Sequence, residues 1–271
     1  MLRSAYPQSH VELICVDNGS TDDTLATLER YGSKVKVVIE HVRGPSAARN
    51  AGIRAATGEI VAFTDSDCVV SPEWLGAIVE PLADPSVGAV AGRILAHRPC
   101  SAVAVFGEVI HDHRRAVQEF KPPYFITMNV ACRRSDLTSL GMFDERLLRG
   151  EDVDLAYRML QAGMNFAYRR DAVIYHRNRD TIVALAREGF QHGYYSIQVH
   201  KLHREFLSSY QPDSTPPVEV EQAELEHPAF ELSPRRTELY WAAFRFAKKV
   251  GKALARRRAE QLLTTCTTAD A

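Results

Sequence analysis

The chain has 271 residues, of which 45% are hydrophobic, 25% charged and 8% aromatic, as in a folded globular protein. Its 33 basic and 34 acidic side chains nearly cancel to a formal charge of −1, which excludes nucleic-acid binding through bulk positive charge. The five cysteines are scattered and none lies in a CxxC pair, so reduced thiols are predicted rather than a zinc ribbon or a disulfide framework. Without an apolar run long enough to span a bilayer, or an apolar signal-peptide segment at its start, the chain is predicted to be cytoplasmic.

Short apolar runs alternate with helical patterns along the first 207 residues. The pattern predicts strands at 11–16, 35–40, 59–64, 87–95 and 166–175. It predicts helices from Ser20, over 46–56, from Ser71, over 151–161 and from 181 to about 207, with a less regular segment at 97–142. Strands and helices that alternate at this spacing are typical of an α/β fold with a mainly parallel sheet.

The composition changes after residue 207. Residues 211–231 hold six acids, four prolines and no basic residue, which predicts a linker. Residues 235–258 then carry nine Lys or Arg, and a helix there would be amphipathic. Its apolar face would hold Tyr240, Ala243, Phe244, Ala247, Val250, Gly251 and Leu254, and its basic face Arg245, Lys248, Lys249, Lys252 and Arg256. The pattern fits an anionic membrane surface and equally fits packing on the preceding domain.

Acidic residues follow two of the predicted strands, Asp17 after the strand at 11–16 and Asp65 and Asp67 after the strand at 59–64. Open α/β sheets bind ligands beyond the carboxyl ends of their strands. Two carboxylates separated by one residue can converge on one hard cation such as Mn²⁺ or Mg²⁺, with a diphosphate completing its shell. An Asp-x-Asp sequence alone fits an ordinary solvated turn as well.

Five segments in a fixed order carry a more specific signal: VELICVDNGSTDDT, GPSAARNAGI, GEIVAFTDSDC, GMFDERLLRGEDVDLAYR and YH. Together they resemble the nucleotide-sugar glycosyltransferases of family two, which have the GT-A fold, a Rossmann-like mainly parallel sheet flanked by helices. The resemblance runs over residues 2–203. It implies a glycosyltransferase domain at 1–207, with a nucleotide-binding half at 1–96 and an acceptor-binding half at 97–207. A linker at 208–234 and a basic amphipathic helix and tail at 235–271 would follow.

The resemblance implies a donor site that binds a nucleotide-sugar, with UDP as the expected nucleotide. Asp17 would contact the nucleotide base, although an Asx turn within its own loop is an alternative role. Gly44, Arg49 and Asn50 match the stretch that lines the donor pocket in the family. Arg49 suits a phosphate and a structural carboxylate partner equally.

The resemblance also implies a metal site for Mn²⁺ or Mg²⁺. Asp67 would ligate the cation directly, and Asp65 would bind the ribose or a metal-bound water. His176 follows the strand at 166–175, where the family often places a histidine that contacts the metal or the diphosphate. The other nearby histidines (His111, His113, His192, His200 and His203) are predicted not to be ligands.

An inverting sugar transfer needs a base for the acceptor hydroxyl, and the resemblance assigns that role to Asp152. Glu151 would position the acceptor or Asp152. Asp154 lies on another helical face and is expected to be structural or to support the site without touching the substrate. An acid at a helix N-terminus is also a common cap. The implied acceptor is the hydroxyl of a glycan, a lipid-linked glycan or a small molecule, and the implied location is cytoplasmic or on the inner membrane face.

The chain departs from the family at its start, because residues 1–20 align with the end of the family's first helix and its second strand. The first strand–helix unit is therefore missing, and either the true start lies upstream or the chain is a truncated form. The two rival functions are a nucleotidyltransferase, which would carry a Gly-rich basic loop near its N-terminus, and a non-catalytic nucleotide-sugar-binding or partner module.

Overall fold

The computed structural model describes residues 4–211 and 232–267, with side chains described up to residue 258. The strands are β1 (Ile14–Asp17), β2 (Lys36–Ile39), β3 (Ile60–Thr64), β4 (Cys68–Val70), β5 (Val87–Ala96), β6 (Asn129–Arg133) and β7 (Asn165–His176). The helices are α1 (Thr24–Glu29), α2 (Pro45–Ala55), α3 (Trp74–Val79), α4 (Ala102–Ile110), α5 (His113–Gln118), α6 (Arg134–Ser139), α7 (Glu151–Gln161), α8 (Ile182–Leu202), α9 (Arg204–Ser209) and α10 (Pro234–Thr267). The α/β class predicted from the sequence is confirmed.

The described strands form two sheets rather than one. β1 and β2 pair in parallel by themselves, and the second sheet has the order β3-β6-β5-β7-β4. In this second sheet only β5 and β7 are parallel, so the sheet is mixed and the expected predominance of parallel pairs is wrong. The physical reason is the α4–α5 segment, which leaves β5 at its carboxyl end and brings the chain back at that end. Because β6 starts there, it runs antiparallel to β5.

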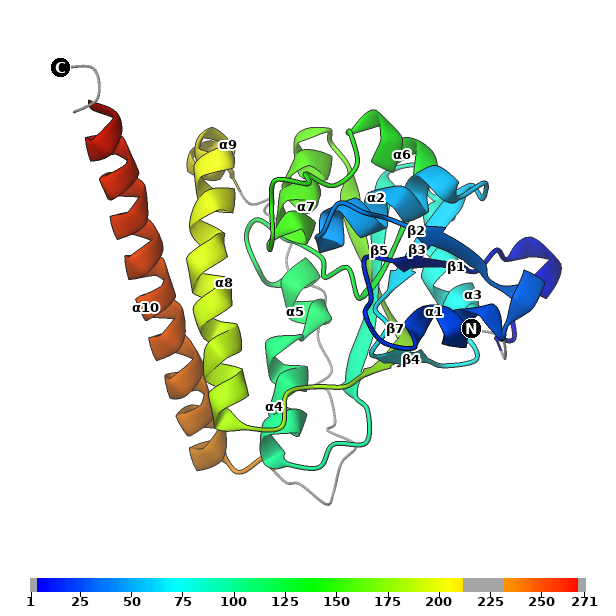
Figure 1. Ribbon diagram of the computed structural model, residues 1–271, viewed down its shortest axis with the longest axis horizontal. Helices are drawn as coiled ribbons and strands as arrows, with labels where there is room; N and C mark the ends of the chain where they lie inside the picture. The colour runs from blue at the N-terminus through cyan, green and yellow to red at the C-terminus, as the bar shows by residue number, and fades with distance from the viewer. Residues whose placement is uncertain (1–3, 212–231, 268–271) are drawn as a thin grey trace.

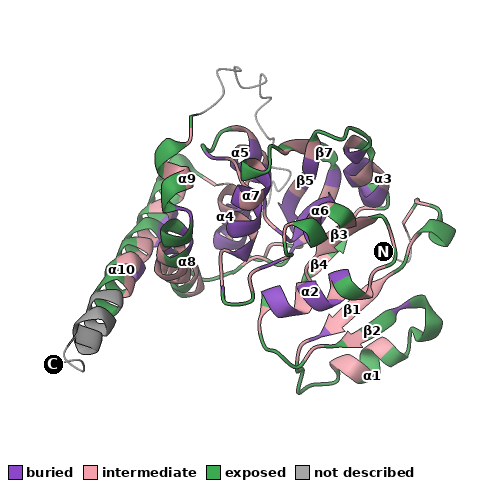
Figure 2. Cartoon of the chain, turned by 90° about the horizontal axis from the view of Figure 1, so that it is seen from above, coloured by how far each residue is buried: buried purple, intermediate pink, exposed green. Residues whose placement is uncertain are grey.

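The core lies on both faces of the five-stranded sheet. Trp74 and Ile78 of α3 pack against Val90 and Ile174 on one face. On the other face Leu155 of α7 joins the second core cluster. β5 and β6 are almost entirely buried, whereas the β1–α1–β2 unit is mostly half-buried or exposed (Figure 2).

Most predicted elements lie within a few residues of the observed ones. The helix predicted over 151–161 is observed with the same ends, and the strand at 166–175 is one residue longer at each end. The helix predicted from Ser20 begins instead at Thr24, because the Ser20 N–H is oriented toward the Asp17 carboxylate (3.4 Å) within the preceding turn. The segment at 97–142 is more regular than expected, since it holds α4, α5, β6 and α6.

Two long helices, α8 and α10, lie side by side beyond α4 and α7, on the side of those helices away from the sheet (Figure 1). Their backbones approach closely where glycines replace side chains: a Cβ at Gly193 would lie 2.0 Å from the Lys248 carbonyl oxygen, and a Cβ at Gly251 would lie 2.2 Å from that of Phe190. Phe244 is buried against α4 and α8. Residues 235–258 therefore pack on the domain through one face of their helix.

The predicted apolar face of that helix is divided by this packing. Tyr240, Phe244 and Gly251 are buried, but Val250 and Leu254 are exposed, so they do not share the buried face as expected. The predicted linker at 208–234 lies mostly outside the described residues, apart from its ends. Among the helices that are described, none is both long and apolar enough to cross a membrane.

Candidate active site

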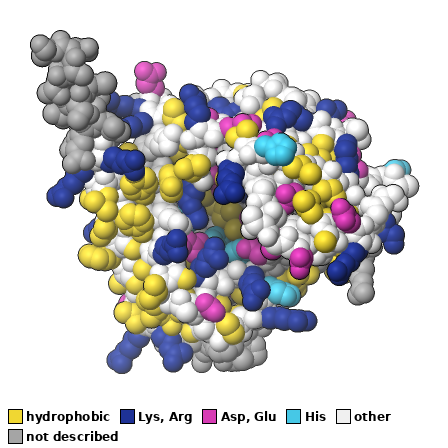
Figure 3. Space-filling model, viewed as in Figure 1, with side chains coloured by type: hydrophobic (Ala, Val, Ile, Leu, Met, Phe, Trp, Pro, Cys, Tyr) yellow, Lys and Arg dark blue, Asp and Glu magenta, His cyan; other side chains and the backbone are white. Residues whose placement is uncertain are grey.

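A cleft of about 1140 Å³ lies between the sheet and the helices α4, α5, α8 and α10. Figure 3 shows this hollow with acidic and histidine side chains inside it and basic side chains around it. Most of the predicted site residues line it: Arg49, Asp65, Asp67, Glu151, Asp152 and His176. Asp17, Gly44 and Asn50 are not among its lining residues.

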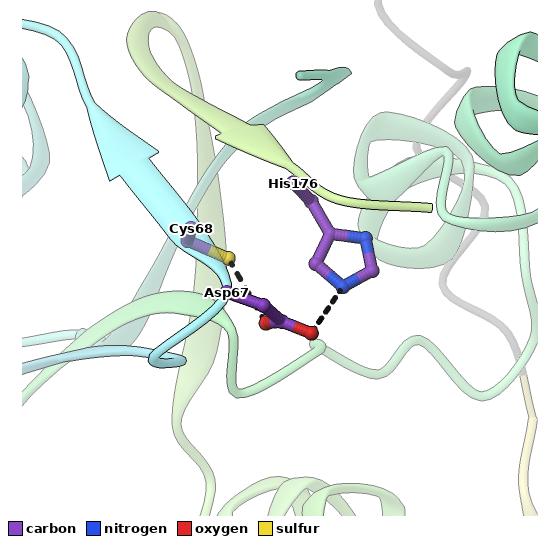
Figure 4. Close-up of side chains that lie close together, drawn as sticks. All are labelled: Asp67, Cys68 and His176. Atoms are coloured by element: carbon purple, nitrogen blue, oxygen red, sulfur yellow. Dashed lines mark hydrogen bonds and ion pairs between the residues drawn. The ribbon is translucent and has the colours of Figure 1, made fainter. Parts of the chain in front are cut away.

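The most compact group in the cleft joins the ends of β4 and β7. Asp67 precedes β4 and His176 ends β7, and β4 pairs with β7 so that Cys68 lies opposite His176. The Asp67 Oδ2 and His176 Nε2 atoms are 3.4 Å apart (Figure 4). The other ring nitrogen of His176 bonds the Asn178 side-chain oxygen at 2.7 Å. Asn178 thereby orients the ring, which leaves Nε2 directed at the carboxylate.

Donor atoms of Asp67, Cys68 and His176 all lie within 4.8 Å of one another, close enough to share a metal ion. The hydrogen bond with His176 outweighs burial and lowers the pKa of Asp67, so its carboxylate is charged and suited to a hard cation. His176 would have to release its Nε2 proton to bind the same cation. Burial, with Asp65 and Asp67 nearby, raises the pKa of the Cys68 thiol to about 12, so the sulfur stays protonated. Carboxylate oxygen suits a hard cation such as Mn²⁺ or Mg²⁺, whereas imidazole nitrogen suits a transition-metal ion better than it suits Mg²⁺.

Arg49 connects the two acidic motifs across the cleft. Its guanidinium lies 2.5 Å from a Glu151 oxygen and 3.3 Å from an Asp65 oxygen, and its charge sits over the ring of Phe143. Burial by itself would lower the pKa of Arg49, but Glu151 and Asp65 outweigh it and raise that pKa. Arg49 thus contacts carboxylates in the structure, and its contact with a donor phosphate stays a prediction.

Asp152 lies in the first turn of α7, directly after Gly150, whose φ of 81° is left-handed. A side chain at position 150 would also collide with Val199, so this start of the helix depends on glycine. Asp152 keeps some contact with the cleft but is surrounded by protein on most sides. This burial, followed by the negative charge of Glu151, raises the pKa of Asp152 well above that of a free aspartate. Such a carboxylate is a stronger base than an exposed one.

Asp17 ends β1 and is 4% exposed. One of its carboxylate oxygens is buried without a hydrogen-bond partner among the described atoms. The neighbouring Asn18 side chain bonds the Glu40 and Val42 carbonyls and the Gly44 N–H, which ties this loop to the start of α2. Gly44 has a φ of 137°, so its backbone turn favours glycine. The hydrogen bonds of Asn18 therefore hold the loop after β1 in place beside the Asp17 oxygen that lacks a hydrogen-bond partner.

Asn50 has a different environment from the one expected of a ligand contact. Its amide donates to the Phe143 carbonyl and to Glu145, and its oxygen accepts from the Phe143 N–H. These bonds at 2.9 Å use both donors and hold the 143–145 loop onto α2. In this structure Asn50 positions a loop, and its assigned contact with the donor stays a prediction.

The remaining histidines have varied surroundings. His113 is a core residue, since its ring bonds the Gly92 carbonyl and accepts from the Ile126 N–H, and burial lowers its pKa to about 3. His203 bonds Asp154, which also pairs with Arg158, and these contacts are those expected of a structural residue. His111 lines the cleft, contacts the ring of His176 edge to face and lies 3.4 Å from Glu188.

The sequence reasoning missed several cleft residues. Burial, together with the charge of Asp152, raises the pKa of Tyr124 to about 12. Glu188 comes from the middle of α8, and Lys248 and Lys252 come from α10. The i, i+4 spacing of the two lysines was visible in the sequence, but it does not indicate that α10 faces a cleft lined by residues from much earlier in the chain.

The cleft thus combines a candidate cation site on one side with a buried carboxylate on the other. The family model "Glycosyl transferase family 2" matches residues 1–141, which is more than half of the chain. The chain belongs to this family.

Two curated relatives illustrate the similarity. The chain is 34% identical over 161 residues to the pre-mycofactocin glycosyltransferase of Mycobacterium tuberculosis, covering 56% of this chain and 34% of that protein. It is 29% identical over 204 residues to the glycosyltransferase AglE of Haloferax volcanii, covering 73% of this chain and 67% of that protein. The chain thus spans about a third of the first relative's length.

A solved structure with the same architecture is the mannosyltransferase PcManGT of Pyrobaculum calidifontis, described in complex with GDP-Man and Mn²⁺. The two structures match with a TM-score of 0.58 at 20% identity, over 99% of this chain and 73% of that one. The match covers nearly the whole chain and confirms the GT-A fold class.

Proposed function

We propose that this chain is a metal-dependent inverting glycosyltransferase that moves a sugar from a nucleoside-diphosphate donor to an acceptor hydroxyl. The observation that carries the proposal is the pair of acidic groups lining one cleft, Asp65 and Asp67 at the sheet edge and Glu151 and Asp152 at the start of α7. The relatives named as glycosyltransferases support the activity.

The donor end of the site is proposed to run from the cation site toward β1. Asp67 and His176 would hold a divalent cation, with Asp65 nearby. When bound there, the cation supplies positive charge that stabilises the departing diphosphate. The unsatisfied Asp17 oxygen suits an N–H of the nucleotide base, because a buried acceptor without a partner costs free energy until a donor reaches it.

The transfer itself is proposed to depend on Asp152. Its carboxylate takes the proton of the acceptor hydroxyl while the hydroxyl oxygen forms a bond to the anomeric carbon. The bond from that carbon to the diphosphate oxygen breaks on the opposite face, and the diphosphate leaves with the electron pair. A raised pKa favours this role, because a base whose pKa lies closer to neutral pH accepts the proton more readily.

Arg49 is proposed to position these groups rather than to bind the donor directly. Its paired contacts with Glu151 and Asp65 fix the distance between the two acidic motifs. A lysine could not bridge both, since it lacks the fork of the guanidinium.

Calorimetric titration of the full chain with UDP, GDP and dTDP, with and without Mn²⁺ or Mg²⁺, tests the donor site. We expect one nucleotide to bind only with the cation, and binding to weaken in Asp67→Asn. Asp171→Asn is a matched control, because Asp171 is an exposed acid that pairs with Arg169 away from the cleft. Absence of binding by all three nucleotides to folded protein would overturn the proposal.

We further propose that α10 rests on an anionic membrane surface. Four exposed apolar residues recur on one side of this helix at spacings of seven, four and four: Leu239, Phe246, Val250 and Leu254. Exposed Lys249 and Arg256 lie beside this stripe. Hydrophobic and basic side chains together suit the boundary of an anionic bilayer.

Sedimentation with vesicles tests this surface. The chain is expected to sediment with vesicles that contain phosphatidylglycerol and less with pure phosphatidylcholine. Binding should decrease in Phe246→Ser/Val250→Ser and persist in Ile39→Ser, which removes an equally exposed apolar residue from β2. Equal sedimentation of all three proteins would remove the support for this surface.

A further inference from the structure

Two half-buried lysines on α10, Lys248 and Lys252, line the same cleft as the catalytic acids. They are one helical turn apart, so their Cβ atoms lie about 6 Å from each other on one face. Within the described part of the chain, neither lysine forms an ion pair with a carboxylate. Burial, and then the charge of Lys252, lowers the pKa of Lys248. Two neighbouring cations are therefore held in a confined place without compensation from the protein.

The packing of α10 shows that this placement is built into the fold. The Lys248 carbonyl lies against Gly193 of α8, where any side chain would collide with it. Phe244, one turn earlier, is buried against α4 and α8. Because the helix is held tightly around Lys248, the two lysines do not reach the cleft by chance rotation of a loose extension.

The acids that share this side of the cleft already have partners. Glu188 lies 3.4 Å from His111 and 3.8 Å from His192, and these contacts outweigh its burial and lower its pKa. Asp112 caps α5 and lies 3.7 Å from Arg114. Among the described residues, the lysine pair thus has no available carboxylate on the elements that face it, which leaves room for an anion that the described residues do not supply.

We propose that Lys248 and Lys252 bind a phosphate group carried by the sugar acceptor. This inference rests on the proposed function, because it identifies the acceptor's chemical class for the same cleft. The donor diphosphate is assigned to the opposite, acid-lined side. A phosphate monoester carries between one and two negative charges at neutral pH, which matches two adjacent ammonium groups better than a single carboxylate does.

Two sources can supply such a group, a soluble phosphorylated sugar and a phosphorylated lipid. The probes are therefore glucose 6-phosphate against glucose, and a polyprenyl phosphate in detergent micelles against the uncharged polyprenol of the same length. The full chain is first saturated with Mn²⁺ and the nucleotide that it binds, so that the donor site is filled. Binding of each probe is then measured by calorimetry and by tryptophan fluorescence, since Trp241 lines the cleft.

The test variant is Lys248→Gln/Lys252→Gln, which keeps side-chain length and helix propensity while removing both charges. The matched control is Lys201→Gln, an exposed lysine near the end of α8 that does not line the cleft. We expect a phosphorylated probe to bind at least about tenfold more tightly than its neutral counterpart, and the double variant to lose about tenfold in affinity. The control should bind like the original protein.

If only the polyprenyl phosphate binds more tightly than its neutral counterpart, the acceptor is carried by a phosphorylated lipid. If both phosphorylated probes bind equally, the lysine pair recognises the phosphate group alone. The inference is overturned if neither phosphorylated probe exceeds its neutral counterpart, or if the double variant binds as tightly as the control. Failure of every nucleotide to bind, with phosphate binding retained, would instead overturn the proposed donor site and leave the lysine site standing.

Discussion

The β1–α1–β2 unit and the five-stranded sheet contribute to one proposed active site but are built differently. β5 and β6 are buried along nearly their whole length, with core clusters on both faces. In contrast α1 has no buried residue, and β2 is exposed at three of its four positions. Hydrophobic burial therefore holds the five-stranded sheet in place, whereas hydrogen bonds such as those of Asn18 hold the β1–α1–β2 unit. The comparison predicts that substitutions in the core of the sheet mainly lower the free energy of unfolding. Substitutions in the β1–α1–β2 unit should mainly lower the affinity for the nucleotide.

The largest effect is expected at the rim of the well-packed sheet. Asp152→Asn removes the proposed base, and sugar transfer should fall by roughly 10²–10⁴-fold. Nucleotide binding should remain, because Asp152 does not belong to the proposed donor end. Measurement of turnover together with nucleotide affinity checks this, and a variant that retains its turnover would exclude Asp152 as the base.

The next effect concerns the core of the sheet. Asn129 is fully buried in β6, accepts from the Trp74 indole and donates to the Arg93 and Ala172 carbonyls. Asn129→Ala leaves these groups unsatisfied and should lower the free energy of unfolding by about 2–4 kcal/mol. Val37→Thr on exposed β2 should change it by less than about 0.5 kcal/mol. Urea denaturation of both variants decides this, and equal losses would contradict the division between the two regions.

A smaller effect, of the opposite kind, is expected in the nucleotide-binding unit. Asp17→Asn replaces a buried carboxylate that lacks a partner for one oxygen, so the melting temperature should stay the same or rise. Nucleotide affinity should nevertheless fall by about tenfold, because an amide can present an N–H where the base needs an acceptor. Thermal melting and calorimetry on the same sample test both halves. Unchanged affinity would remove Asp17 from the donor site.

The smallest expected effect is a shift in pH dependence. Burial and the charge of Glu151 raise the pKa of Asp152, so activity should decrease as the pH falls through that raised pKa and the base becomes protonated. Glu151→Gln removes the neighbouring charge and should move the acidic limb of kcat/KM to lower pH by about half a unit to one unit. An acidic limb that stays in place would show that Glu151 does not control this titration.

The same pKa has a consequence for stability. A carboxyl group with a raised pKa in the folded state stabilises the fold below its unfolded pKa of about 3.9, and this contribution is lost as the pH rises through the folded pKa. Asp152→Asn should therefore be more stable relative to the original protein at pH 8 than at pH 4. Melting temperatures at the two pH values provide the measurement, and a difference independent of pH would contradict it.

Local sequence determined the elements and the types of side chain at the site. Apolar runs bounded by turn residues located β3, β5, β7 and α7 to within one or two residues. The acids after β3 and at the start of α7 could be selected as site residues because each stands in a short continuous segment whose residue types indicate its chemistry. The same local information misplaced the start of α1, since Ser20 looks like a cap until the Asp17 carboxylate is seen beside its N–H.

Tertiary structure alone decided what those residues face. Nothing local to β6 indicates that it runs antiparallel between β3 and β5, because strand direction depends on where the preceding helices return the chain. Nothing near Arg49 indicates that Glu151, 102 positions away, is its partner. From its sequence alone, the basic helix could either bind an anionic membrane surface or pack on the preceding domain. Only the close approach of Gly193 and Gly251 to the opposing backbone shows which face packs on α8, and which lysines are thereby directed into the cleft.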